Sequence, residues 1–144
     1  MAVVLSILLS GLFMIPGGNI TAGTQSVTDT ACDLHRGTCT QPLSEGAGNV
    51  TLDIRPKPVK AMTDLIFTVQ IIGILSAGEI PRVDLGMPGM NMGPNRVYLK
   101  KINEKGTFTG SGIIVRCPSG KTLWQVTVTV PGFGTAEFLI DVVY

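Results

Sequence analysis

The sequence predicts an all-β fold, an immunoglobulin-like antiparallel β-sandwich of about seven strands. Runs in which Val, Ile, Leu or Phe alternate with polar residues recur from residue 50 onward, and this period of two is typical of half-buried strands. The 18 Gly and 9 Pro supply turn signals between these runs. No segment shows a convincing apolar stripe with the helical period of about 3.6 residues. Short alternating strands with regularly spaced turns are typical of an immunoglobulin-like sandwich.

The expected strands can be placed along the chain. Residues 65–75 are almost continuously apolar, which indicates a central strand. The sequence Asn103–Gly106 is typical of a hairpin turn. Gly110 and Gly112, in the strand that follows, indicate a bulge or the close approach of another strand. The seven strands are expected at 50–55, 65–75, 80–85, 95–102, 107–115, 123–130 and 136–143.

Four aromatic side chains on the apolar faces of these strands are expected to fill the core: Phe67, Phe108, Trp124 and Phe138. We assign them packing and no chemistry. The cores of β-sandwiches are tight, so function is expected on the end loops.

Composition excludes two classes of function. The net charge is +1, there is no basic stripe, and the aromatic residues are one Trp, two Tyr and five Phe, which does not fit a nucleic-acid-binding groove. His35 is the only histidine in the sequence, so catalysis that needs several histidines is excluded.

The N-terminal region predicts export. Residues 2–15 form an apolar run that matches a signal peptide in length and is short for a membrane span, which needs roughly 20 residues. No Lys or Arg precedes the run, so an uncleaved N-terminal anchor is the alternative. We expect residues 1–22 to be a signal peptide or anchor, 23–48 a Cys-containing extended segment and linker, and 49–144 the β-sandwich, located in the periplasm or cell envelope.

Three cysteines are expected to form one disulfide in an exported protein. Cys32 and Cys39 flank His35, and Cys117 stands alone after a predicted strand. A Cys32–Cys39 bond would close a small loop, whereas a Cys39–Cys117 bond would attach the N-terminal segment to the sandwich. The sequence does not choose between them. A second soft-metal or redox site built from Cys32, His35 and Cys39 is a weaker alternative, because the spacing matches no zinc motif.

The stretch Asp84–Pro94 carries the strongest functional signal. Met87, Met90 and Met92 are three of the six methionines, spaced M-x-x-M-x-M among Gly and Pro. Methionine usually fills gaps in a core, and three in one turn is unusual. Thioether sulfur is a soft ligand that selects Cu(I). The pattern therefore predicts a Cu(I) site, and the alternatives are an apolar lid over the sandwich or a contact surface for a partner protein.

Residues 50–143 resemble the YtkA-like family, small bacterial extracytoplasmic domains. The resemblance lies in the run 56–67, in the stretch 83–93 with its Met-Pro-x-Met motif, and in the Gly-rich strand that precedes Trp124. It implies an immunoglobulin-like sandwich, copper binding through Met87, Met90 and Met92, and partners among copper-handling or oxidase-assembly proteins. The cysteines are not part of the family pattern.

These observations predict an exported, non-enzymatic Cu(I)-binding module. Imidazole or thiolate from His35, Cys32, Cys39 or Cys117 could complete the ligand shell. The alternative is a structural or protein-interaction β-sandwich whose methionines form an apolar cap or contact patch. A catalytic Cys117–His35 pair is a remote third reading. No nucleic acid is expected as a partner, and contact with a membrane is expected only through an uncleaved N-terminal segment.

Overall fold

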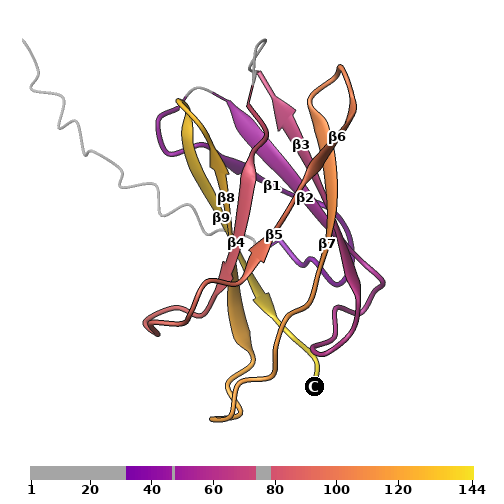
Figure 1. Ribbon diagram of the computed structural model, residues 1–144, viewed down its shortest axis with the longest axis vertical. Coiled ribbons are helices and arrows are strands. Elements are labelled where there is room, and N and C mark those ends of the chain that lie inside the picture. Colours follow the sequence, from indigo (N-terminus) through magenta and orange to yellow (C-terminus); the bar gives the residue numbers. More distant parts are fainter. Residues whose placement is uncertain (1–31, 47, 74–78) are drawn as a thin grey trace, which may run out of the picture.

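The computed structural model describes residues 32–46, 48–73 and 79–144, which form an antiparallel β-sandwich (Figure 1). The predicted leader, 1–22, lies outside these residues, as does the rest of the chain before Cys32. The described ranges contain no helix that is long and apolar enough to cross a membrane. The strands within the described ranges are β1 Cys39–Pro42, β2 Asn49–Arg55, β3 Leu65–Ile72, β4 Arg82–Gly86, β5 Arg96–Val97, β6 Lys100–Asn103, β7 Thr107–Gly112, β8 Leu123–Val130 and β9 Gly134–Asp141.

The strands form two sheets, in the orders β1-β2-β3-β7-β6 and β5-β4-β8-β9. Strands β2, β3, β7 and β6 occupy the positions of A, B, E and D in an immunoglobulin sandwich, and β5, β4, β8 and β9 those of C′, C, F and G. Strand β1 is an additional edge strand beside β2. The predicted fold class is therefore confirmed, with β1 and a divided fourth strand beyond the seven expected.

The expected strand at 95–102 is wrong, because the chain changes sheets within it. Arg96 and Val97 pair with β4 in one sheet, whereas Lys100–Asn103 pairs with β7 in the other. The alternation of buried and exposed side chains continues through the crossover, since Val97 and Leu99 are buried and Tyr98 between them is exposed. The alternation of apolar and polar residues in the sequence therefore did not reveal that the chain changes sheets here.

Strand β1 was not predicted either. It lies in the segment that we expected to be a linker, and only four residues, Cys-Thr-Gln-Pro, form it. A run this short and polar has no recognisable strand pattern. Its register is set by β2, where Cys39 lies opposite Leu52.

The core lies between the two sheets and contains the aromatic residues that the sequence placed there. Trp124, Phe67, Phe108 and Phe138 are each at most 2% exposed. The two glycines of β7 lie where the crossover passes over it, because a Cβ at Gly110 would collide with the carbonyl oxygen of Tyr98. The predicted close approach of another strand is thus confirmed.

Candidate functional site

The methionines lie in the loop between β4 and β5, which projects sideways from the lower half of the sandwich in Figure 1. Met90 N–H donates to the carbonyl oxygen of Met87 at 3.1 Å, closing a four-residue turn. Gly89, the third residue of the turn, has φ 72°. A positive φ at that position with Pro88 before it defines a type II turn, which favours Pro then Gly. The sequence Met-Pro-Gly-Met thus specifies the turn that holds the first two methionines.

The three methionines differ in exposure. Met87 is 5% exposed and belongs to the core, Met90 is 38% exposed, and Met92 is partly buried and packs against the core. The antiparallel β4–β8 ladder pairs Gly86 with Gln125. Extending this register by one residue on each strand places Met87 opposite the buried Trp124. Met87 therefore matches the lid interpretation, whereas Met90 matches an accessible ligand.

All three methionines nevertheless line one pocket of about 240 Å³. Its floor is the outer face of the four-stranded sheet, where Gly86 has no side chain and Gln125 and Thr127 of β8 face outward. Asn91 and Met92, which follow the turn, line the same pocket. The loop thus gathers its methionines around one open hollow.

Asp84, at the edge of the same pocket, is already engaged. Its Oδ2 accepts from Arg82 Nε and its Oδ1 from Arg96 Nε, both at 2.9 Å. The hydrogen bond and the negative charge of Asp84 raise the pKa of Arg96. Because both carboxylate oxygens are occupied by guanidinium groups, the pocket offers thioethers as its soft ligands, with the neutral oxygens of Asn91, Gln125 and Thr127 beside them.

His35 is not among the residues that line the methionine pocket. Its Nδ1 accepts from Val59 N–H at 3.0 Å, and its Nε2 lies 2.7 Å from the carbonyl oxygen of Asp141. These partners assign the neutral tautomer with the proton on Nε2, which donates to the carbonyl. With both nitrogens engaged, the ring connects the N-terminal loop to the end of β9 and offers no free lone pair to a metal.

The disulfide joins Cys32 to Cys39, with Cα atoms 5.5 Å apart, so the structure selects the small loop over the Cys39–Cys117 alternative. This disulfide loop, residues 32–39, is also held by Lys57, whose Nζ donates to the carbonyl oxygens of Leu34 at 2.5 Å and Gly37 at 3.2 Å. Sequence reasoning missed Lys57, because its partners are backbone carbonyls about 20 residues earlier in the chain.

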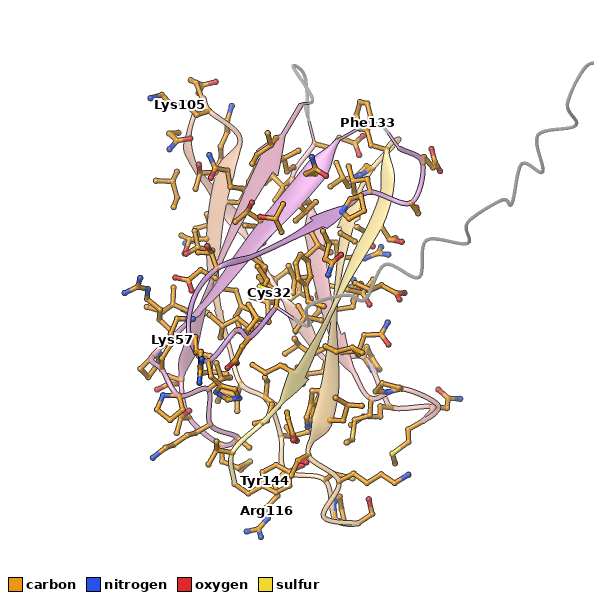
Figure 2. The ribbon with its side chains drawn as sticks, turned by 180° about the vertical axis from the view of Figure 1, so that it is seen from behind. Cys32, Lys57, Lys105, Arg116, Phe133 and Tyr144 are labelled. Carbon is orange, nitrogen blue, oxygen red and sulfur yellow. A yellow bond between two sulfur atoms is a disulfide. The ribbon has the colours of Figure 1, made fainter. Side chains whose placement is uncertain are left out.

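Cys117 is a free, buried thiol in the loop between β7 and β8. Its Sγ lies 2.9 Å from Ser119 Oγ, and its backbone N–H donates to the hydroxyl of Tyr144. The hydrogen bonds to Ser119 lower the pKa of the Cys117 thiol, with a smaller contribution from Lys121. Arg116 stacks over the Tyr144 ring at 5.3 Å beside the C-terminus (Figure 2). Cys117 lines neither the methionine pocket nor the cavity beside the disulfide.

Searches for similar proteins found no matching family profile, no matching curated protein and no matching solved structure. Within the described residues, no group of three or more His, Cys, Asp or Glu side chains is arranged to hold a metal ion.

Proposed function

We propose that the chain is an exported, non-enzymatic module that binds Cu(I), with Ag(I) as its chemical analogue, through the methionine turn. One observation carries the proposal: Met87, Met90 and Met92, all in the loop between β4 and β5, line the same open pocket. Thioethers are soft and neutral, so they suit Cu(I). They are not protonated near neutral pH, so protons do not compete with the metal for the sulfur.

The exposed fractions of the three side chains indicate which methionine meets the ion first. Met90 is 38% exposed and is the first point of contact, with Met92 second. Met87, at 5% exposed, reaches the ion only if its sulfur turns from the core toward the pocket that its residue lines. A site of two or three neutral sulfurs without a carboxylate favours a monovalent soft ion over zinc or Cu(II).

The disulfide supports the proposed location. Disulfides persist in oxidising compartments such as the periplasm and the cell surface, and they are rare in the cytoplasm. The partners that we propose are copper-handling or oxidase-assembly proteins of the same compartment, as the resemblance to the YtkA-like family implies.

The test is a Cu(I) titration against a chromogenic chelator, with the disulfide intact. We expect the double variant Met90→Leu/Met92→Leu to lose binding, because leucine keeps the volume and removes the sulfur. Met62→Leu is the matched control, since Met62 is 66% exposed but lies outside the turn. Equal affinity in the wild type and the double variant would refute the proposal.

The burial of Met87 favours a second candidate, a structural or interaction module in which the methionines cap the end of the sandwich. This candidate predicts that the double variant changes the free energy of unfolding or the binding of a partner protein, and that the wild type shows no saturable Cu(I) binding.

A further inference from the structure

The disulfide and one residue of the methionine turn line the same cavity beside β8 and β9. This cavity of about 350 Å³ is lined by Cys32, Cys39 and Pro88, the second residue of the turn, together with Gln125. Gln125 also lines the methionine pocket. Gln125 therefore borders both hollows, of which the methionines line one and the cysteines the other. In Figure 2, Cys32 lies at mid-height of the sandwich.

Cys39 and the loop between the two cysteines are held in place by contacts that do not involve the S–S bond. Cys39 begins β1 and lies opposite Leu52 in the ladder with β2. Between the cysteines, the loop is anchored by Lys57 at two carbonyl oxygens and by His35 at both ring nitrogens. Reduction would therefore leave two thiols beside the same cavity, close enough to hold one ion between them, because their Cα atoms are 5.5 Å apart.

We propose that reduction of Cys32–Cys39 converts the methionine pocket into a mixed thiolate–thioether Cu(I) site, so that the redox state of the disulfide sets the affinity for the metal. This inference rests on the proposed function, since it assumes that the turn binds Cu(I). The oxidised chain offers neutral sulfur alone, whereas the reduced chain adds thiolates, which bind Cu(I) strongly.

The reductant is a dithiol, and the exchange is balanced in two steps. A thiolate of the dithiol attacks Cys32 Sγ, the exposed end of the bond, because Cys39 is only 2% exposed. The Cys39 thiolate leaves and takes a proton. The mixed disulfide now joins Cys32 to the first sulfur of the reductant. The second thiol of the reductant attacks that first sulfur, which releases the Cys32 thiol and closes the reductant's disulfide. Two electrons and two protons pass to the chain. Cu(I) keeps its oxidation state and displaces the thiol protons on binding.

The test measures Cu(I) affinity in a Cys117→Ser background, in which Cys32 and Cys39 are the remaining cysteines. The oxidised chain and the dithiol-reduced, desalted chain are titrated anaerobically against a chromogenic Cu(I) chelator. We expect one Cu(I) per chain in both states and binding at least about tenfold tighter after reduction. Adding Cys32→Ser/Cys39→Ser should give the affinity of the oxidised chain with or without the dithiol.

Met90→Leu/Met92→Leu distinguishes a shared site from two separate ones. In a shared site, these substitutions weaken Cu(I) binding by the reduced chain as well. A reduced chain that binds a second Cu(I), or whose affinity is independent of Met90 and Met92, overturns the inference. So does an oxidised chain that binds Cu(I) through its methionines and gains nothing on reduction, an outcome that leaves the proposed function intact.

The same measurements distinguish failure of the proposed function from failure of this inference alone. If the oxidised chain binds no Cu(I) and the reduced chain binds it without the methionines, both proposals fail. A urea titration checks that each variant unfolds cooperatively. Cys32→Ser alone, which leaves the Cys39 thiol in the β1–β2 ladder, supplies a second variant should the double substitution not fold, and we expect its affinity to fall between those of the oxidised and reduced chains.

Discussion

Met87 and Met90 lie three positions apart in the sequence and yet have different surroundings. Met87 follows directly from β4 and keeps the inward direction of Val83 and Leu85, so it is buried. The turn then reverses the chain, and Met90 is left at the surface. The proposed copper site therefore depends on Met90 more than on Met87, although the spacing M-x-x-M-x-M treats them alike.

Asp53, on β2, is the acidic partner of the lysine that holds the disulfide loop. Its side chain is 12% exposed, and its Oδ1 lies 2.9 Å from Lys57 Nζ in an ion pair. Its Oδ2 accepts from Arg55 Nε at 2.8 Å. Burial alone would raise the pKa of Asp53, but Lys57 and Arg55 outweigh it and hold that pKa below its usual value.

Replacing Asp53 with Asn should therefore destabilise the protein in a pH-dependent way. Because its pKa is lower in the folded state, the carboxylate contributes stability above its unfolded pKa of about 4, and this is lost as the pH falls through the folded value. We expect a cost of about 1–2 kcal/mol at pH 7 that disappears in acid. Urea unfolding of wild type and variant across the pH range measures it.

Asp64→Asn is the matched control. Asp53 and Asp64 both line an open groove of about 1020 Å³ beside β2, but Asp64 makes no ion pair among the residues that the structure describes. Its substitution should change the free energy of unfolding by less than about 0.5 kcal/mol. A cost at Asp53 that stayed constant from pH 7 into acid would contradict the assigned ion pairs.

At the scale of elements, the passage from β5 to β6 determines how closely the sheets approach. The chain crosses from one sheet to the other over β7, with Tyr98 directly above Gly110 and Val97 above Gly112. A Cβ at Gly112 would lie 2.6 Å from Val97 Cγ2. Glycine is therefore required in β7 by the crossover and not by a turn.

Gly110→Ala should destabilise the sandwich by about 1–3 kcal/mol, because the added methyl group meets backbone that cannot move without breaking the crossover. Gly86→Ala is the control, since a Cβ at this strand position has no atom within 4 Å. Thermal unfolding of both variants measures the difference. Equal melting temperatures would show that the crossover yields to the methyl group.

For the whole molecule, the disulfide loop joins edges of the two sheets. Strand β1 extends the five-stranded sheet, while His35 reaches the end of β9 in the four-stranded sheet. Ser44, just after β1, adds a second link to β9, because its N–H donates to the carbonyl oxygen of Thr135. The N-terminal segment of the described chain therefore closes one side of the sandwich.

Removing the disulfide with Cys32→Ser/Cys39→Ser should lower the free energy of unfolding by about 2–3 kcal/mol, the value expected for closing a short loop of this length in the unfolded chain. The native fold should persist, because Lys57 and His35 still hold the loop. Urea unfolding and near-ultraviolet circular dichroism test this, and loss of the native aromatic signal in the variant would contradict it.

Much of the fold was predictable because a half-buried strand alternates apolar residues, which face the core, with polar residues, which face solvent. The runs at 50–55 and 123–130 match β2 and β8 closely, and the buried aromatics follow from the same alternation. The crossover at Tyr98 was not predictable, since inward and outward positions continue to alternate when a strand changes sheets. Strand β1 was hidden because its pairing comes from β2 and not from its own residues.

The candidate site divides in the same way. By itself, the sequence determined that Met87 and Met90 share a turn, with Met92 two residues beyond it, because Pro-Gly between Met87 and Met90 specifies a type II turn locally. It also confined the cysteines to a few pairings. Only the tertiary structure decided which cysteines bond, that His35 is occupied, and that the disulfide lies beside the turn. Those facts depend on which strand edges meet, and contacts between distant segments leave no pattern in either segment alone.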